Sequence, residues 1–521
     1  MYWADKIADE IISSGRKPYW VDDMKTPSGK IHVGSLRGVI IHDLIYKALL
    51  SRKVSATFSY VIDDHDPMDS LPVYLDRKKY LPHMGKPFYT IQAPVPGYSS
   101  YSEYFAKDFI EVFNSLGAHP KIIWASELYK SGKMDGVIAE VLDKAQVIRD
   151  IYKEMYGRGK PSDWYPFQVI CPKCGKVGTT QVYAWDGKEV SFKCEPDLVT
   201  WAEGCGSEGK VSPFGGTGKI PWKVEWACKW KIIGITVEGA GKDHMNAGGS
   251  HEVAEKVCER VINYPVPYPF SHEFFLIGGK KMSSSKGRGA SAKEVSEIIP
   301  PYLLRFLMAR VRFSRAIDFT PDSWTIPDLF DEYDRAAQNY WEKGEKDDLG
   351  RTFEMSQPSG EPPTKMFLAR FRDIVQVAQM PNLDAKKYFG SKKENKLNEK
   401  EESFLSERLN YAKIWLKDYA PEEAIFEFRK SLPEEAKNLS DSQRRYLAEL
   451  IQLIELVKDA EALEKEMYDL AKKMEIPTKD AFVAVYTALL GKAYGPKAAW
   501  LIMGEDRQKI IKRFKEVGLM K

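Results

Sequence analysis

The sequence is poor in cysteine, carries little net charge and contains no long apolar run. Its 521 residues include six cysteines, and its formal net charge is +3. So few cysteines argue against a disulfide framework, and so small a charge excludes a surface that is basic throughout. No apolar run approaches the ~18 residues that span a bilayer, and residues 1–12 have the pattern of an acidic amphipathic helix, unlike a signal peptide. We therefore expect a cytoplasmic protein without a membrane segment, whose contacts with nucleic acid come from local patches.

A glycine-rich stretch near the start of the chain lies between a predicted strand and a predicted helix. It reads Thr-Pro-Ser-Gly-Lys-Ile-His-Val-Gly-Ser-Leu-Arg-Gly at residues 26–38. Residues 18–21 are aromatic and β-branched, and the apolar residues from 36 to 48 have the spacing of a buried helix face. A helix that starts after such a turn can receive a phosphate or an adenine nucleotide. The stretch matches neither the G-x-G-x-x-G nor the Walker A pattern, and alone His32 is more typical of a turn.

A second glycine-rich stretch, at residues 278–287, is rich in lysine and serine. It reads Gly-Gly-Lys-Lys-Met-Ser-Ser-Ser-Lys-Gly. Lysine ammoniums and serine hydroxyls donate to anions, and glycines let the backbone bend. This composition suits a polyphosphate whose charge moves during a reaction. A solvated linker is the competing interpretation.

Acidic residues and glycines follow two predicted strands, at residues 56–62 and 232–237. The first strand is followed by Asp63, Asp64, His65 and Asp66, and the second by residues 238–244. Ligands of open α/β sheets bind at the carboxyl ends of strands, so both segments are candidates to face a substrate. Turns and helix caps are the alternative interpretation.

Four cysteines have the spacing of a structural zinc site. Cys171 and Cys174 form a C-x-x-C pair, and Cys194 and Cys205 follow with predicted short strands between them. Such a set is typical of a four-thiolate zinc knuckle, although the last two cysteines are ten residues apart. The other two cysteines lie in apolar contexts and are expected in the core.

From about residue 325 the pattern changes to long helices with few strand signals. Composition alone indicates only a helical domain.

Together, the two glycine-rich stretches resemble the signatures of class I aminoacyl-tRNA synthetases. His32-Val33-Gly34-Ser35 is similar to their His-Ile-Gly-His motif, and Lys281-Met282-Ser283-Ser284-Ser285 to their Lys-Met-Ser-Lys-Ser loop. Within that class the chain resembles the class I lysyl-tRNA synthetases. Further similar segments occur in order over most of residues 1–330, at residues 27–29, 63–67, 226–231, 241–250 and 319–321.

The resemblance implies an α/β fold: a Rossmann-like catalytic domain with a zinc-bearing insertion, followed by an all-α C-terminal domain. The ranges expected are 1–95 for the first Rossmann half, 96–220 for the insertion with the zinc knuckle, 221–277 for the second half, 278–325 for the lysine-serine loop and its connection, and 326–521 for a helical anticodon-binding domain. The insertion is expected to approach the acceptor end of the tRNA.

The resemblance also implies the reaction and its participants. ATP with Mg²⁺ would activate L-lysine as lysyl-adenylate, and tRNA(Lys) would receive the lysyl group; Zn²⁺ would be structural, and a monomer is expected. The expected catalytic residues are His32, Ser35, Lys281 and Lys286. The expected ATP-binding residues are Pro27, Gly29, His32, Gly34, Ser35, Gly241, Asp243, Lys281, Met282, Ser283, Ser284 and Ser285. The expected lysine-binding residues are Asp23, Asp64, Trp222 and His244, with Glu225 as a further candidate, and the expected zinc ligands are Cys171, Cys174, Cys194 and Cys205.

The loop departs from the general signature, because Ser284 stands at the second lysine position and Lys286 would supply that charge. Two other functions remain open at this point. A small-molecule nucleotidyltransferase shares the His-x-Gly motif but has no use for a long helical domain and a zinc insertion. A non-catalytic RNA-binding paralogue has no use for the lysines of the loop.

Overall fold

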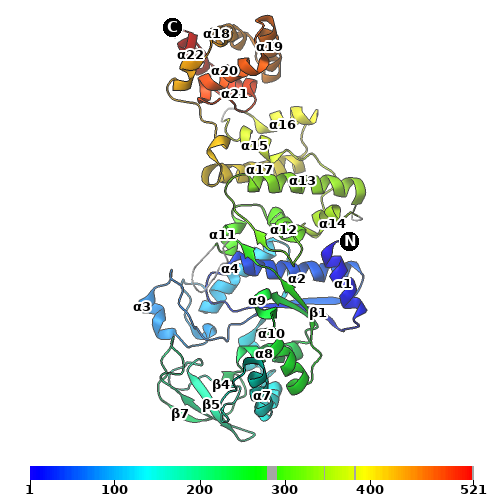
Figure 1. The fold of residues 1–521 in the computed structure, drawn as a ribbon, viewed down its shortest axis with the longest axis vertical. Coiled ribbons are helices and arrows are strands. Elements are labelled where there is room, and N and C mark those ends of the chain that lie inside the picture. Colours follow the sequence, from blue (N-terminus) through cyan, green and yellow to red (C-terminus); the bar gives the residue numbers. More distant parts are fainter. Residues whose placement is uncertain (279–289, 345–346, 381–382, 519–521) are drawn as a thin grey trace. The chain divides into compact units, whose positions relative to one another are not determined.

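The computed structural model describes residues 1–278, 290–344, 347–380 and 383–518 (Figure 1). The chain divides into two compact units. The first contains residues 1–320 and 336–362, and the second contains residues 321–335 and 363–521. Among the described residues, no helix combines the length and the apolar character needed to cross a membrane.

A five-stranded parallel sheet forms the centre of the first unit, in the order β10–β9–β1–β2–β3. Its strands are β1 (Tyr19–Lys25), β2 (Ala56–Ile62), β3 (Lys121–Trp124), β9 (Val237–Gly241) and β10 (Tyr268–His272). The chain adds β2 and β3 on one side of β1 and later adds β9 and β10 on the other. This reversal makes β1 the switch point of a doubly wound sheet, where ligands bind outside the carboxyl ends of the strands.

Helices cover both faces of this sheet (Figure 1). On one face lie α1 (Trp3–Ser13), α2 (Val33–Ser51) and α4 (Tyr101–Ser115); on the other lie α8 (Trp222–Ile233) and α10 (Ser250–Val257). Twelve of the nineteen positions of α2 carry aliphatic residues or glycine, and the helix is buried over most of its length because it packs on β1, β2 and α1.

Two sequence predictions in this region need correction. The expected insertion, residues 96–220, includes β3, which pairs with β2 in the central sheet, so its first part belongs to the catalytic core. The predicted strand at residues 232–237 is wrong, because α8 continues to Ile233 and β9 begins only at Val237. Gly234 ends the helix with a φ of 89°, a conformation that glycine adopts without strain.

The rest of the segment between β3 and α8 consists of three helices followed by small antiparallel sheets. The helices are α5 (Ala125–Lys130), α6 (Asp135–Asp143) and α7 (Ala145–Tyr156). Strands β5 (Thr180–Trp185), β6 (Val190–Cys194) and β7 (Glu208–Val211) form one sheet, and β4 (Gln168–Val169) pairs with β8 (Gly218–Lys219). The four predicted zinc ligands lie on or beside these strands.

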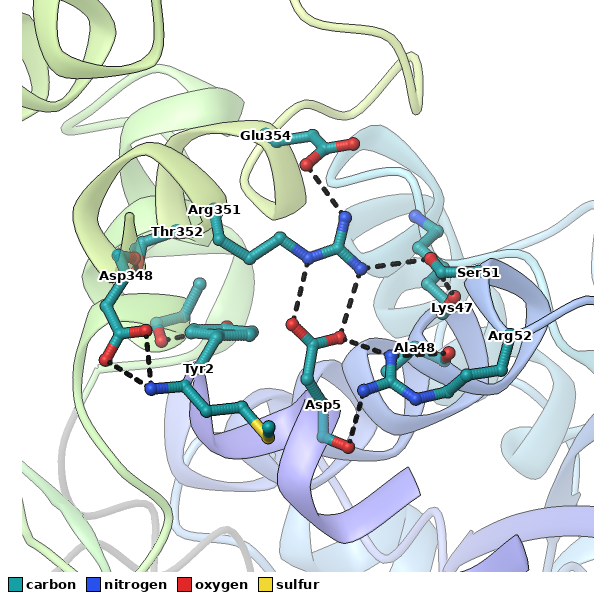
Figure 2. Close-up of polar contacts among 12 residues, drawn as sticks. Tyr2, Asp5, Lys47, Ala48, Ser51, Arg52, Asp348, Arg351, Thr352 and Glu354 are labelled. Carbon is teal, nitrogen blue, oxygen red and sulfur yellow. Dashed lines mark hydrogen bonds and ion pairs between the residues drawn. The ribbon is translucent and has the colours of Figure 1, made fainter. Parts of the chain in front are cut away.

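After β10 the first unit continues with a short parallel pair, β11 (Phe275–Leu276) and β12 (Ile317–Asp318). Helices α11 (Ala292–Ser296), α12 (Pro301–Arg310) and α14 (Asp348–Met355) complete it, with α3 (Arg77–Tyr80) and α9 (Lys242–Met245) in its loops. Figure 2 shows how α14 is held: buried Arg351 donates to Asp5 of α1 and to Ser51 at the end of α2, and Asp5 also pairs with Arg52.

The second unit is helical in its described residues. Its helices are α15 (Phe371–Val377), α16 (Ala385–Lys393), α17 (Glu399–Asp418), α18 (Asp441–Leu456), α19 (Ala460–Lys473), α20 (Thr478–Leu490), α21 (Ala498–Gly504) and α22 (Arg507–Gly518), together with the first part of α13 (Thr325–Lys343). Buried Arg408 of α17 pairs with Asp334 of α13 and stacks over Phe330. The all-helical expectation for this region is confirmed.

Candidate active site

A cavity of about 680 Å³ lies at the carboxyl ends of the central strands. The end of β1, the loop after β2, the residues of β9 and α9, and the segment from the end of β10 to β11 all line it. It also contains the first turn of α2. Its position is the one expected of the ligand site of a doubly wound sheet.

The first glycine-rich stretch reaches this cavity through the start of α2. His32 is the N-cap of the helix, and His32, Gly34 and Ser35 all line the cavity. Pro27 and Gly29 are buried in the turn before it and are not part of the lining. The positive end of this helix, together with an imidazole and a hydroxyl, forms a group suited to an anion.

Residues 290–292, which follow the second glycine-rich stretch in the sequence, pair with this same turn. Val33 N donates to Ala290 O over 3.3 Å and Ala292 N donates to Ile31 O over 2.9 Å, as His32 and Ser291 form an antiparallel bridge. On the near side, His272 to Phe275 line the cavity. Both flanks of residues 279–289 are therefore attached at the cavity that holds His32.

The residues between these flanks were predicted to supply Lys281, Met282, Ser283, Ser284, Ser285 and Lys286. They lie outside the described residues.

Two buried lysines of the chain form ion pairs with three carboxylates on the cavity wall. Lys219 Nζ lies 3.2 Å and Lys229 Nζ 3.1 Å from the same oxygen of Glu225. Lys219 also pairs with Asp66, and Lys229 with Asp63. Burial alone would lower the pKa of both lysines, but the carboxylates outweigh it and raise the pKa of each. Glu225, Asp63 and Asp66 thus already have cationic partners.

Asp23, at the end of β1, is a carboxylate of a different kind. It lines the cavity and accepts a hydrogen bond from the Met24 amide over 2.8 Å. Its only ion-pair geometry within the described part of the chain is with His42, at 3.8 Å. His42 Nε2 accepts from the Gly239 amide, and burial lowers the pKa of this histidine to about 4, so it stays neutral. Burial correspondingly raises the pKa of Asp23 to about 7.

A second carboxylate with a raised pKa, Glu238 of β9, lines the same cavity. It accepts hydrogen bonds from the indole nitrogens of Trp226 and Trp230. Burial, only partly offset by these hydrogen bonds, raises the pKa of Glu238 to about 8. The region around Asp23 and Glu238 is therefore short of positive charge, and a cationic ligand would supply it.

An aromatic wall faces these carboxylates. Trp222 and Trp226, one turn apart on α8, both present T-shaped contacts to His244, with ring centroids 5.8 and 6.1 Å apart. Trp222 is 45% exposed in spite of its size, and it lines the cavity with His244. The exposed Asp243 and Gly241 lie beside them; a Cβ on Gly241 would come within 2.8 Å of the Asp243 carboxylate.

One predicted lysine-binding residue is not brought to the cavity. Asp64 is buried, and its two oxygens accept from the amide and the hydroxyl of Ser126 at the start of α5, over 2.8 and 2.6 Å. Asp64 is therefore a hydrogen-bond partner of α5. Asp63 and Asp66 line the cavity, but successive residues after a strand point in different directions.

Sequence reasoning missed the two buried lysines and Glu238. Lys229 stands in a segment that was singled out, residues 226–231, but a lysine on a helix is usually solvated. The available signal was the spacing of Glu225 and Lys229, which puts both on one face of α8.

The four predicted zinc ligands do come together. One sulfur from each of Cys171, Cys174, Cys194 and Cys205 lies within 4.8 Å of the others. This is the donor set and compactness that a tetrahedral zinc ion requires. The remaining cysteines, Cys228 and Cys258, are buried in the apolar core as expected.

Comparisons with known proteins identify the family of the chain. Residues 1–359 match the family model described as tRNA synthetases class I (K), and residues 396–517 match an anticodon binding domain. A lysine–tRNA ligase of Methanosarcina barkeri is 31% identical over 99% of this chain and 98% of its own length. One of Methanocaldococcus jannaschii is 32% identical over 99% of both chains. A glutamate–tRNA synthetase structure from Elizabethkingia anophelis aligns over 96% of this chain and 100% of its own, at 14% identity and a TM-score of 0.47.

The parallel sheet, the His-x-Gly helix start and the helical C-terminal region are those of a class I tRNA synthetase. The chain belongs to the family described as tRNA synthetases class I (K), whose model covers more than two thirds of its length.

The raised pKa of Asp23 predicts a pH-dependent stability difference. The folded state holds the Asp23 proton more tightly than the unfolded state does, so the stability that this proton contributes is complete below pH 4 and lost as the pH rises to about 7. Asp23→Asn does not titrate. In the ligand-free protein, the free energy of unfolding of Asp23→Asn relative to wild type should rise by roughly 4 kcal/mol between pH 4 and 8.

Chemical denaturation across this pH range measures the difference. Asp69→Asn, which removes an exposed carboxylate from the same cavity, is the matched control and should give a flat difference. A flat difference for Asp23→Asn as well would contradict a perturbed carboxylate.

Proposed function

We propose that this chain is a lysine–tRNA ligase that joins L-lysine to tRNA(Lys) through a lysyl-adenylate. The curated full-length relatives carry that name. The observation that carries the chemistry is the backbone pairing of residues 31–33 with residues 290–292, which attaches the lysine-serine stretch to the histidine turn at one cavity.

In the first step, a carboxylate oxygen of lysine attacks the α-phosphorus of ATP, the bond to the bridging oxygen breaks, and pyrophosphate leaves. In the second step, a ribose hydroxyl at the tRNA 3′ end takes the lysyl group and AMP leaves. Neither step needs a covalent intermediate with the enzyme. Both need alignment of the reactants and stabilisation of the negative charge that moves onto the leaving group.

The first glycine turn would hold the phosphates where the α-phosphorus reacts. His32 and Ser35 would donate to phosphate oxygens, and Gly34 would leave space for them. Lys281 and Lys286, with Ser283, Ser284 and Ser285, would neutralise the β- and γ-phosphates, and Met282 would contact the nucleotide. Asp243 would accept from a ribose hydroxyl beside Gly241. Mg²⁺ bound with ATP would supply further positive charge to the phosphates.

Lysine selection follows from which carboxylates are unoccupied. Lys219 and Lys229 already form ion pairs with Glu225, Asp63 and Asp66. Asp23 forms no ion pair with a lysine or arginine among the described residues, and the charge of Lys25 only partly offsets the effect of burial on its pKa. Asp23 would therefore pair with the ε-ammonium, while Trp222 and His244 would wall the apolar stem. Asp64, held by Ser126, is no longer a candidate for this role.

The central test has two assays. The first measures exchange between ATP and pyrophosphate in the presence of each of the twenty amino acids, and the second measures aminoacylation of total tRNA. Only lysine should stimulate exchange, and tRNA should become lysylated. Lys281→Ala should lower the exchange rate by about 100-fold or more, because loss of one charge donor in the transition state has effects of this size, while lysine binding is retained. Unchanged exchange in Lys281→Ala would count against the assignment. Adenylyl transfer without any tRNA charging would favour a small-molecule nucleotidyltransferase.

Lysine affinity tests the role of Asp23. Asp23→Asn should weaken lysine binding by about 100-fold, since a partly buried ion pair to the substrate is lost. Wild-type affinity should increase as the pH rises towards about 7, where Asp23 ionises, and this rise should be absent in the variant. Asp64→Asn is the control and should bind lysine normally; a larger effect there than in Asp23→Asn would reverse the assignment.

The cysteine cluster is proposed to hold one structural Zn²⁺, which would crosslink the loops of the small sheets. Purified protein should contain about one zinc per chain by elemental mass spectrometry. Cys194→Ser should lose it, and the matched control Cys258→Ala, which alters a core cysteine outside the cluster, should keep it. Zinc retained in full by Cys194→Ser would refute this ligand set.

A further inference from the structure

Arg37 of α2 is a fully buried cation whose guanidinium contacts backbone carbonyls from two distant segments. Its Nη1 donates to Phe274 O over 2.8 Å. Its Nη2 lies within hydrogen-bonding distance of the carbonyl oxygens of Arg312, Phe313 and Arg315. The side chain is 0% exposed. Arg37 therefore joins the helix that starts at His32 to the segments before β11 and before β12.

These two segments form the base on which the lysine-serine stretch begins. Phe274 directly precedes β11, which ends two residues before Gly278. Phe274 O also accepts from Ile317 N over 3.0 Å, and Glu273 N donates to Phe313 O over 2.9 Å. The carbonyls that Arg37 holds are thus part of the hydrogen bonding that aligns β11 with β12.

Burying a guanidinium in this place is costly, and no described carboxylate forms an ion pair with it. Burial lowers the pKa of Arg37 to about 10, and Glu273 offsets only part of that effect. Its Nε has no hydrogen-bond partner among the described atoms. If the side chain at position 37 only filled space, an apolar residue would be more favourable there than a buried charge. The arginine therefore has a specific geometric role.

The position of Arg37 on α2 indicates that role. Ser35 and His32 precede it by two and five residues, within about 8 Å along the helix axis. The rigid start of α2 therefore carries the donors proposed for phosphate and, in the next turn, the side chain that fixes the base of the lysine-bearing stretch.

We propose that Arg37 is a positioning residue for adenylate formation. It sets the distance between the histidine turn and residues 272–275, which line the same cavity, and so keeps the shape of the site in which the adenylate would form. Arg37 contacts neither substrate in this arrangement and acts through the backbone of Phe274 and of residues 312–315. This inference rests on the proposed lysine ligase activity.

Arg305 of α12 provides a matched control. It is also a fully buried arginine of the first unit, and it also donates to carbonyls, those of Leu116 and Met355, as well as to Asp43. Its partners do not include the segments beside residues 279–289. Arg305→Met should therefore lower the melting temperature at least as much as Arg37→Met does, without a selective loss of chemistry.

Two measurements on the full chain test the proposal. In lysine-dependent ATP–pyrophosphate exchange, Arg37→Met should lower kcat by about 100-fold, as expected for misplacement by about 1 Å, with lysine affinity retained. Arg37→Lys, which keeps the charge but can reach only one of the two segments, should lie between wild type and Arg37→Met. Arg305→Met should keep kcat close to wild type.

Hydrogen exchange of the substrate-free protein gives a readout that does not depend on activity. Peptides covering residues 272–278 and 310–318 should exchange faster in Arg37→Met, and not in Arg305→Met. If Arg37→Met does not fold, Arg37→Lys is compared with its control Arg305→Lys in both experiments instead.

The outcomes separate the two claims. Wild-type protein without lysine-dependent exchange would refute the proposed function, while hydrogen exchange would still decide whether Arg37 fixes the two segments. Active wild type with equal kcat losses in the Arg37 and Arg305 variants would overturn the positioning role, as would unchanged hydrogen exchange at residues 272–278 and 310–318.

Discussion

The attachment of residues 290–292 to the turn at residues 31–33 is the constraint on which the active site depends. These segments are far apart in the sequence, and each is the start of a helix: His32 caps α2 and Ser291 caps α11. Their backbone hydrogen bonds hold Ala290 to Ala292 at the same turn that places His32 in the cavity.

Charge balance is the second constraint, and it explains how a cavity rich in acidic residues can be selective. A carboxylate that already has a buried cation gains little from another one, whereas a desolvated carboxylate without one gains a great deal. Lys219 and Lys229 form ion pairs with one group of carboxylates, whereas burial raises the pKa of Asp23 and Glu238. Under the proposed function, this difference would direct the substrate ammonium to the side of Asp23.

Much of this arrangement could be predicted from the sequence, because strong local patterns carried it. The strand at residues 56–62, the helix after His32, the clustered cysteines and the helical C-terminal region all have local signals. Three features did not. The direction of Asp64 depends on Ser126, the ionisation of Asp23 depends on burial by other elements, and the role of Lys229 depends on Asp63, which is far away in sequence. Partners of this kind are fixed only by tertiary packing.

Two adjacent residues of α2 show how closely packing limits which side chains fit at the start of this helix. Arg37 points to the carbonyls beside β11 and β12, while a Cβ on its neighbour Gly38 would come within 2.9 Å of the Asp23 carboxylate. A larger residue at position 38 would therefore displace the proposed lysine ligand, and a shorter one at position 37 would release the base of the catalytic stretch. One helix turn would thus bear on both the proposed amino-acid side and the proposed phosphate side of the cavity.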